Sequence, residues 1–400
     1  MKRSDQALPA REHVHVLTPG DHYSPRTGSA VPTVVDGLVR GASTSSAPSS
    51  VVVARGTYPD RYDGAQIIEY PQASARPWER YTDAAASRVG LPRHGARRAF
   101  GATVRDQGTW APSYVFAHNA PQLVPLVDTD RHLPVLYAHN QLLRTYGHRE
   151  LARTLGPVHR IVCVSAFLAD ETTALLPPGL RDRVVVVHNG VDAPPASSGA
   201  PSTDRPARGD ALHVVFVGRA IPDKGVDVVV DAVRRLARSD VRLTVVGAAG
   251  FDAADPLTPY ERDLRRRAAG TTVPTTFTGF LARGEVREVL RTADVVVVPS
   301  RWAEPFALTA LEGMAAGAAV VASDIGGIPE AVGTAGILVP PGDVAALAET
   351  LAALADDESL LGRTQAAGRS HAAAMDWSHA RARLDQVLVG ALAHSRGGPA

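Results

Sequence analysis

The chain has 400 residues, more than one hydrophobic core usually organises, so we expect two domains. Lys and Arg total 42 against 41 Asp and Glu, and this near balance argues against a protein that mainly grips a nucleic-acid backbone. The one cysteine, Cys163, excludes an intramolecular disulfide framework and a multi-cysteine metal site. Apolar runs fall far short of the roughly 20 residues that span a bilayer. No apolar segment follows the charged N-terminus, so we expect a soluble, cytoplasmic protein.

Short β-branched runs alternate with longer Ala-, Leu- and Arg-rich stretches of helical period, which is typical of parallel sheets covered by helices. The sequence therefore predicts an α/β protein. The expected strands are, in chain order, His13–Leu17, Val51–Ala54, Tyr114–His118, Val135–His139, Arg160–Val164, Val184–His188, His213–Gly218, Arg242–Gly247, Val273–Thr278, Val295–Pro299, Ala319–Ser323 and Gly336–Val339. Most end on His, Ser, Gly or Asn, and open α/β sheets bind ligands beyond the carboxyl ends of their strands.

A proline-rich stretch divides the chain. Residues 193–210 hold four prolines among Ser, Gly and Ala, a composition typical of a linker that joins no sheet. We expect one α/β domain over residues 12–192 and a second over residues 211–374, with a final helix over residues 377–392. Two similar halves joined by such a linker predict a ligand cleft between them.

The stretch Val295–Met314 is the most informative in the sequence. A buried strand ends at Pro299, and a helix is expected to open near Pro305, because proline suits a first helical turn. Glu304 precedes that proline and should stay extended outside the helix. Glu312 should lie about two turns inside it, which separates the two carboxylates by roughly 9–10 Å along the helix axis.

The start of this helix is predicted to bind phosphate. The free N–H groups of Phe306, Ala307 and Leu308 would form an anion site there. Carboxylates on either side fit a nucleotide sugar, with sugar hydroxyls on Glu304, the diphosphate on the amides and ribose hydroxyls on Glu312. The alternative is an ordinary helix with an N-terminal acid that the helix dipole favours.

A basic turn follows another predicted strand. The strand ends at Gly218, Arg219 and Lys224 emerge from the turn, and Gly225 opens the next helix. Two cations at a strand end are well placed to hold a diphosphate and to stabilise it as a leaving group. A solvated basic turn is the alternative.

These motifs, with two further segments, resemble the donor half of retaining glycosyltransferase family 4. The segments are Glu304-x7-Glu312, the turn from Gly218 to Gly225, His188-Asn189-Gly190-Val191-Asp192, and Gly326-Gly327-Ile328-Pro329-Glu330. The resemblance implies the GT-B fold, in which two Rossmann-like domains face across a cleft. The first domain would bind the acceptor and the second the nucleotide sugar. Trp377-Ser378 matches the pair that opens the family's crossover helix, which packs on the N-terminal domain.

The resemblance also implies roles in the N-terminal half. Gly28 and Ser29 lie where the family usually has a glycine pair near the donor phosphate, with Ser29 in place of the second glycine. His118 ends a strand where many members place a histidine beside the reacting sugar. His139 and Asn140 end the next strand and would line the acceptor pocket.

The implied reaction is a retaining transfer of a hexosyl group from a UDP- or GDP-linked sugar to an acceptor hydroxyl. Arg219 and Lys224 would hold the leaving diphosphate, which can itself take the acceptor's proton. His118 would orient the sugar, and Glu304 would help to select it. The nucleotide sugar would be a co-substrate, and no cofactor is expected.

No metal is expected either. Asp128 and Asp130 superficially resemble the aspartate pair of another glycosyltransferase fold, but they lie in a loop of the acceptor half. Basic residues cluster from Arg88 to Arg105, but Gly90 and Pro92 interrupt the segment, so a solvated surface is expected in place of a membrane-binding helix.

The acceptor is expected to be small and soluble. The turn Tyr23–Pro25 and the segment His139-Asn140-Gln141 resemble aminoglycoside-pathway glycosyltransferases that act on aminocyclitols, which would imply antibiotic biosynthesis. If the acceptor is cationic, Asp21 should contribute to its pocket. The alternatives are transfer to a lipid or polysaccharide at a membrane surface, and a nucleotide-sugar-binding protein that catalyses nothing.

Overall fold

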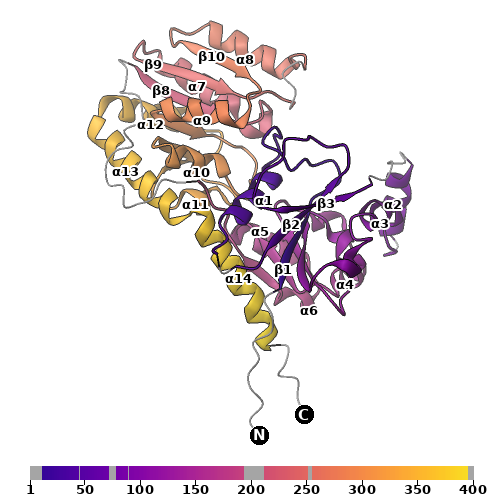
Figure 1. The fold of residues 1–400 in the computed structure, drawn as a ribbon. Helices are drawn as coiled ribbons and strands as arrows, with labels where there is room; N and C mark the ends of the chain where they lie inside the picture. Colours follow the sequence, from indigo (N-terminus) through magenta and orange to yellow (C-terminus); the bar gives the residue numbers. More distant parts are fainter. Residues whose placement is uncertain are drawn as a thin grey trace.

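The computed structural model describes residues 11–44, 46–71, 78–88, 90–192, 211–250 and 255–394. The linker predicted at residues 193–210 lies outside this part of the chain. Two parallel sheets, each flanked by helices, form two lobes (Figure 1). The predicted α/β class with two parallel sheets is therefore confirmed.

The first lobe contains a seven-stranded parallel sheet of order β3-β2-β1-β4-β5-β6-β7. Its strands are β1 (Glu12–Val16), β2 (Ser49–Ala54), β3 (Gln66–Tyr70), β4 (Ser113–His118), β5 (Leu133–Ala138), β6 (Arg160–Cys163) and β7 (Val184–Val186). Its helices are α1 (Ala30–Arg40), α2 (Glu79–Arg88), α3 (His94–Gly101), α4 (His148–Leu155), α5 (Ala166–Leu175) and α6 (Pro178–Arg181), with short 3₁₀ turns at Gln107–Thr109, Pro121–Leu126 and Leu143–Thr145.

The second lobe contains a six-stranded parallel sheet of order β10-β9-β8-β11-β12-β13. Its strands are β8 (Leu212–Val217), β9 (Val241–Val246), β10 (Thr275–Gly279), β11 (Val295–Val298), β12 (Ala319–Ser323) and β13 (Ile337–Val339). A 3₁₀ turn (Pro222–Lys224) precedes the helices α7 (Val226–Leu236), α8 (Pro259–Ala269), α9 (Arg283–Thr292), α10 (Leu308–Ala315), α11 (Ile328–Val332), α12 (Val344–Asp356) and α13 (Glu358–Ala374).

Every predicted strand is present, with each end within two residues of its predicted place. Continuous β-branched runs such as the four valines of β11 are buried on both faces, as parallel strands under helices require. Strand β3 was not predicted. It lies at the edge of the first sheet, only Tyr70 in it is buried, and its short QIIEY run gives a weak apolar signal.

The prediction that a helix opens near Pro305 is wrong, because α10 begins at Leu308. The preceding segment is held by a contact distant in sequence: the N–H of Gly327 donates to the carbonyl oxygen of Glu304 at 2.7 Å. A Cβ on Gly327 would lie 2.1 Å from the carbonyl oxygen of Pro305, so this close approach requires glycine. The backbone before α10 is thus fixed by α11, and the axial separation predicted for the two glutamates does not apply.

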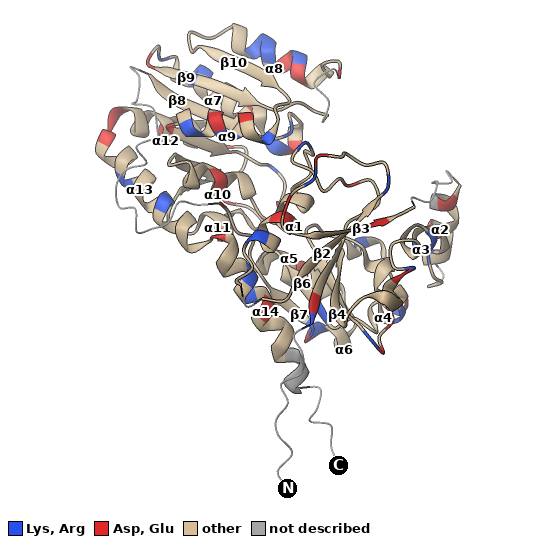
Figure 2. Cartoon of the chain, in the orientation of Figure 1, with Lys and Arg blue, Asp and Glu red and all other residues tan. Residues whose placement is uncertain are grey.

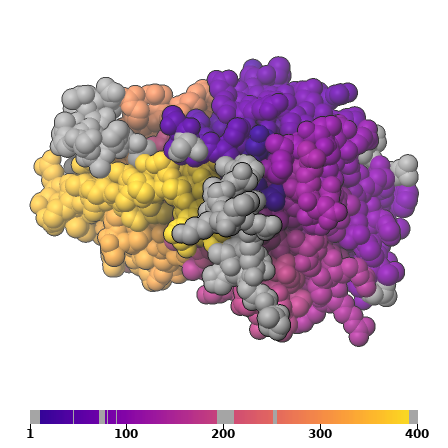
Figure 3. Space-filling view, turned by 60° about the horizontal axis from the view of Figure 1, so that its bottom comes forward, coloured from indigo at the N-terminus to yellow at the C-terminus, as the bar shows by residue number. Residues whose placement is uncertain are grey.

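The final helix, α14 (Trp377–His394), leaves the second lobe and packs on the first, as the yellow chain in Figures 1 and 3 shows. The ring of Trp377 lies so close to α1 that a Cβ on Gly37 would come within 2.2 Å of it. Arg381 is 1% exposed and donates to the carbonyl oxygen of Leu38 at 3.3 Å and to Ser49 Oγ at 3.2 Å. Helix α14, which follows the second lobe in the chain, therefore contacts the first lobe through Trp377 and Arg381.

The order of strands reverses direction at one point in each sheet. In the first sheet this happens between β1 and β4, and in the second between β8 and β11. Loops that leave such neighbouring strands run to opposite faces, so a crevice opens at the carboxyl ends, where open α/β sheets bind ligands. The loops after β1, β8 and β11 carry predicted site residues, whereas His118 is the last residue of β4 and His139 and Asn140 follow β5.

Candidate functional site

The loops after β8 and β11 lie against each other at the switch point of the second sheet. Gly225 has φ +66° and directly precedes α7, and a Cβ there would lie 1.9 Å from the carbonyl oxygen of Pro299. The N–H of Arg301 donates to the carbonyl oxygen of Asp223 at 2.8 Å. Glycine at this position therefore lets the basic turn pack directly against the end of β11.

This packing brings Lys224 and Glu304 together. Lys224 Nζ lies 2.8 Å from Glu304 Oε1, and Ser300 Oγ donates to the same oxygen. The side chain of Glu304 is 8% exposed and that of Lys224 is 26% exposed. The buried carboxylate of Glu304 therefore holds the Lys224 ammonium at the carboxyl edge of the sheet, and the lysine side chain stays partly exposed to solvent. In this state Glu304 positions Lys224, and a contact from Glu304 to sugar hydroxyls stays a prediction.

The structure adds a cation beside the predicted ones. Arg219 is exposed on the turn after β8, and its Nε donates to the carbonyl oxygen of Ala249 at 3.1 Å. Arg301 follows β11 and pairs with Asp227 at 2.8 Å. The Tyr260 hydroxyl also donates to Asp227, at 2.8 Å. Sequence reasoning missed Arg301, although its place two residues beyond Pro299 is a signal that could have singled it out.

Glu312 lies on α10 and is bound by an arginine from α9. Arg283 Nη2 lies 2.6 Å from Glu312 Oε1, while Nη1 of the same guanidinium donates to Thr33 Oγ1 on α1 at 2.7 Å. One side chain therefore connects the predicted ribose carboxylate to the first lobe. No local pattern marks Arg283, because its partners come from distant parts of the chain.

The predicted amide cradle needs correction. Of Phe306, Ala307 and Leu308, only Leu308 belongs to α10, so the unpaired N–H groups of the helix begin there. Pro305, Phe306 and Ala307 are buried in the preceding segment, and the ring of Phe306 stacks on His188 with the centroids 5.8 Å apart. A phosphate site at the start of α10 stays a prediction, with Leu308 as its first member.

The other two motifs of the resemblance join the lobes. Glu330 of α11 accepts hydrogen bonds from the backbone N–H groups of Ala166 at 2.6 Å and Phe167 at 2.8 Å, at the start of α5. It also lies 3.0 Å from His188 Nε2. A carboxylate is favoured at a helix N-terminus by the helix dipole. The second lobe thus provides the acid that stabilises the start of a first-lobe helix.

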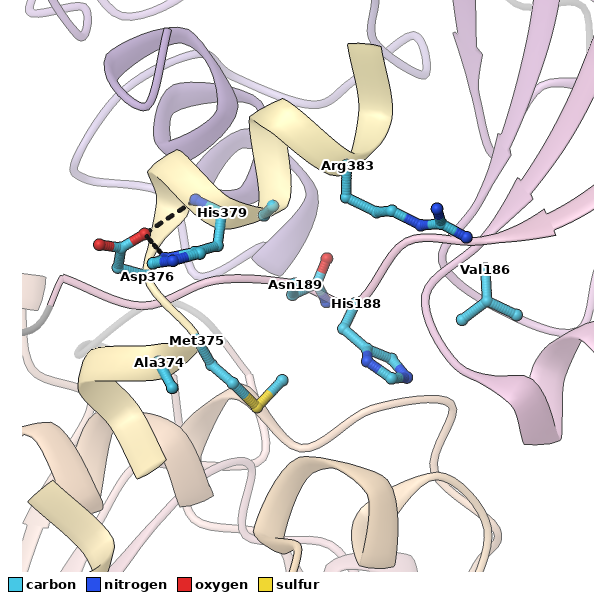
Figure 4. A pocket seen from close by; sticks show the side chains of 9 residues that line it. Val186, His188, Asn189, Ala374, Met375, Asp376, His379 and Arg383 are labelled. Carbon is cyan, nitrogen blue, oxygen red and sulfur yellow. Dashed lines mark hydrogen bonds and ion pairs between the residues drawn. The ribbon is translucent and has the colours of Figure 1, made fainter. Parts of the chain in front are cut away.

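A cavity of about 350 Å³ lies at this junction (Figure 4). It is lined by Val186, His188, Asn189, Ala374, Met375, Asp376, His379, Ala380 and Arg383. Asp376 accepts hydrogen bonds from the backbone N–H and from Nδ1 of His379, both at 2.8 Å. None of the predicted site residues lines this cavity.

Three histidines of the first lobe form a hydrogen-bonded row. His15 Nδ1 lies 2.9 Å from His118 Nε2, and His118 Nδ1 lies 2.8 Å from His139 Nε2. Burial and the neighbouring histidines lower the pKa of His118 well below its ordinary value, and burial lowers the pKa of His139 to about 3. The rings are therefore neutral at physiological pH.

The prediction that the His118 ring lies beside the reacting sugar does not fit this structure. His118 is 0% exposed, and both of its ring nitrogens are occupied by other histidines. His118 on β4 lies directly opposite Tyr137 on β5, and the two rings are stacked with their centroids 5.1 Å apart. His139 is the member of the row that is partly exposed.

The loop after β1 holds the remaining candidates of the first lobe. Ser29 precedes α1, its N–H donates to Thr27 Oγ1 at 3.2 Å, and Gly28 is exposed beside it. Burial raises the pKa of Asp21, and a hydrogen bond with Ser29 opposes this rise. Asn140 is exposed after β5. Contacts of these residues with a donor or an acceptor stay predictions.

Charged side chains occur throughout the described part of the chain, outside the candidate site as well as in it. The described residues contain no group of three or more His, Cys, Asp or Glu side chains that could hold a metal ion. The N–H of Asp130 donates to Asp128 Oδ1 at 3.1 Å, which accounts for Asp128 as a turn residue. Figure 2 shows acidic and basic residues interspersed on both lobes.

The expectation of a solvated basic surface is wrong for part of the α2–α3 region. Arg93 pairs with Glu150, which is 1% exposed, at 2.8 Å and lies 3.7 Å from the centroid of the Tyr146 ring. Arg98 pairs with Glu79 at 2.7 Å, but its own side chain is 36% exposed, as expected of a solvated surface. Within the described ranges, no helix is both long and apolar enough to cross a membrane.

The chain is similar to several known proteins. Residues 211–357 match the family "Glycosyl transferases group 1". Glycogen synthase of Mycobacterium tuberculosis is 36% identical over 234 residues, which cover 58% of this chain and 54% of that protein. D-inositol 3-phosphate glycosyltransferase 1 of Catenulispora acidiphila is 36% identical over 254 residues, covering 60% and 59%. The chain thus spans little more than half the length of the curated relatives that it matches.

Solved structures share the architecture. Anabaena Alr3699/HepE in complex with UDP and glucose gives a TM-score of 0.66 at 17% identity, covering 95% of this chain and 99% of that one. The α,α-trehalose-phosphate synthase (UDP-forming) from Burkholderia xenovorans, in complex with glucose-6-phosphate, gives 0.68 at 16% identity, covering 95% and 100%. Residues 211–357 therefore match the glycosyl transferases group 1, and the described part of the chain has the two-lobed GT-B fold.

Proposed function

We propose that this protein is a metal-independent, retaining glycosyltransferase that moves a hexosyl group from a nucleotide sugar to a hydroxyl of a small soluble acceptor. The observation that carries the proposal is the Lys224–Glu304 pair at the switch point of the second sheet, where Nζ and Oε1 are 2.8 Å apart. The Lys224 ammonium is fixed by a carboxylate at this edge and is partly exposed, so it can bind a diphosphate. The match of residues 211–357 to the glycosyl transferases group 1 supports the same assignment.

The donor would bind on the second lobe, with its diphosphate between Lys224 and Arg219. The first N–H groups of α10, from Leu308 onward, would add an anion site at a helix start. Glu312 would accept hydrogen bonds from the ribose hydroxyls, for which its Oε2 is the carboxylate oxygen not bound to Arg283 in this state. UDP in the Anabaena Alr3699/HepE complex supports a uridine donor, and GDP remains the second choice.

Transfer would depend on positioning and electrostatics. As the bond from the sugar to the diphosphate breaks, negative charge grows on the diphosphate, and fixed cations at this place stabilise that charge. The new bond forms on the face that the leaving group departs from, and a diphosphate oxygen takes the proton of the acceptor hydroxyl. The stereochemical part of this proposal follows from the resemblance of Glu304-x7-Glu312 and the basic turn to a retaining family.

The acceptor would bind at the carboxyl edge of the first sheet. His139, Asn140 and Asp21 are polar groups of the loops after β5 and β1 that are partly or fully exposed. The names of the relatives differ in their acceptors, from glycogen to inositol phosphate, so they support a polyhydroxylated acceptor as a class. Within that class we propose an aminocyclitol, because Asp21 offers a carboxylate to an amino group.

A donor panel tests the function. The protein is incubated with UDP-glucose, UDP-N-acetylglucosamine or GDP-mannose, together with 2-deoxystreptamine or D-inositol 3-phosphate, and nucleoside diphosphate release is followed. NMR of the product reports the anomeric configuration. Lys224→Met should abolish most of the release, whereas Arg266→Met, which changes an exposed cation on α8 paired with Asp263, should not. Tight UDP binding without release from any donor would instead indicate a binding protein.

A further inference from the structure

The row of His15, His118 and His139 leaves one ring nitrogen at each end. At the inner end, His15 Nε2 is buried and has no hydrogen-bond partner within the part of the chain that the structure describes. The ring of His15 is covered by Phe116, whose centroid is 4.6 Å away in a stacked arrangement. At the outer end, His139 is partly exposed, and its Nδ1 has no hydrogen-bond partner among the described residues. One end of the row is therefore closed by the core, and the other is open.

Neutral imidazoles allow only two patterns of protons along this row. A neutral ring carries one N–H donor and one acceptor nitrogen. If His118 donates from Nδ1 to His139, then His15 donates from Nδ1 to His118, and each of the three rings is an Nδ1–H tautomer. If His118 donates from Nε2 to His15, each ring is an Nε2–H tautomer. The choice at any ring thus determines the other two.

The buried end decides between the patterns. In the Nε2–H pattern the N–H of His15 would be a buried donor without a partner, which is among the rarest arrangements in proteins. In the Nδ1–H pattern only an acceptor nitrogen is left unpaired there. A third arrangement, in which an additional proton makes His15 cationic, is disfavoured. Burial and the charges of His13 and Arg381 lower the pKa of His15 well below its ordinary value. The core therefore selects the Nδ1–H pattern.

We propose that His15 and His118 hold His139 as a neutral Nδ1–H tautomer, so that His139 presents a hydrogen-bond donor to an oxygen of the acceptor. His139 would be the acceptor-contacting group, and the two inner histidines would be positioning residues. Acceptor recognition rests on the proposed function, whereas the tautomer does not.

The tautomer can be measured without turnover. Long-range ¹H–¹⁵N correlation spectra of protein with ¹⁵N-labelled histidine distinguish protonated from unprotonated ring nitrogens, and His139→Phe identifies the signals of His139. We expect a protonated Nδ1 in the wild type. We expect His118→Phe to release His139 to the Nε2–H form, which an unconstrained neutral imidazole favours. A wild-type His139 that is Nε2–H, or that is cationic at neutral pH, would overturn the proposal.

Acceptor kinetics test the consequence. With UDP-glucose as donor and 2-deoxystreptamine or D-inositol 3-phosphate as acceptor, His139→Phe should raise the acceptor KM by about fivefold to tenfold, the loss expected for one neutral hydrogen bond. His139→Gln can accept from His118 and donate outward, and should recover most of this loss. UDP affinity should not change in either variant.

A double variant separates positioning from general damage. His118→Phe should raise the acceptor KM, and adding it to His139→Phe should cause no further rise, because both remove the same donor. His132→Gln changes another buried histidine of this lobe and serves as the control. Additive effects, or an unchanged KM in His139→Phe, would overturn the role of His139. If the wild type releases no nucleoside diphosphate at all, the proposed function and the acceptor role of His139 fail together. The wild-type spectrum alone then tests whether His139 is the Nδ1–H tautomer.

Discussion

Glu312→Ala should weaken UDP binding by roughly tenfold to a hundredfold. Hydrogen bonds to a charged group contribute about 1.5–3 kcal/mol, and each 1.4 kcal/mol is a factor of ten in affinity. The ion pair of Glu312 with Arg283 opposes ribose binding, because the ribose must weaken this pair in order to bind Glu312. Their side chains are 24% and 27% exposed, and pairs in contact with solvent contribute about 0–1 kcal/mol. The ion pair therefore reduces the predicted loss without cancelling it.

Calorimetric titration with UDP at fixed ionic strength measures this effect. Glu288→Ala is a matched control, because Glu288 is 68% exposed and pairs with Arg291 at 2.7 Å on α9; its UDP affinity should stay within about twofold of wild type. Arg283→Met leaves Glu312 unpaired and free to meet the ribose, so UDP should bind as tightly as in the wild type or up to about fivefold more tightly.

The opposite responses of the two partners are what distinguish ribose binding from a structural ion pair. Unchanged UDP affinity in Glu312→Ala would remove this carboxylate from the donor site. Equal weakening in Glu312→Ala and Arg283→Met would show that the pair acts by holding α9 and α10 together, and the assignment of ribose to Glu312 would be refuted.

Three further outcomes are expected. Turnover should survive EDTA, because cations of the protein take the place of a metal on the diphosphate, and a complete loss restored by Mg²⁺ or Mn²⁺ would refute this. Gly37→Ala should lower the free energy of unfolding by about 1–3 kcal/mol through overpacking, since its Cβ would lie 2.2 Å from Trp377; chemical denaturation measures this, with Gly362→Ala in an open part of α13 as the control. The protein should not float with anionic vesicles at physiological salt, despite the exposed Trp78, and flotation of most of the protein would favour a membrane acceptor.

Local sequence was sufficient to predict the framework of both sheets. Parallel strands buried on both faces must be continuous β-branched runs, so β11 and its neighbours were recognisable without any knowledge of their partners. The basic turn could also be recognised from the sequence, because Gly218 and Gly225 flank two cations, Arg219 and Lys224, at a strand end. Strand β3 lacked such a signal, since an edge strand with one buried residue needs few apolar side chains.

The tertiary structure decided how these residues face one another. The start of α10 is set by a hydrogen bond from Gly327 to Glu304, which outweighs the local preference of Pro305 for a first helical turn. His118 ends β4 and was therefore predicted to lie in the site, yet its ring is buried between the histidines that follow it and precede it in the row, His139 and His15. Arg283 joins Glu312 to the first lobe only because the lobes meet there. Periodicity records which residues are buried in an element, whereas the direction of a polar side chain depends on partners that the chain brings together only when it folds.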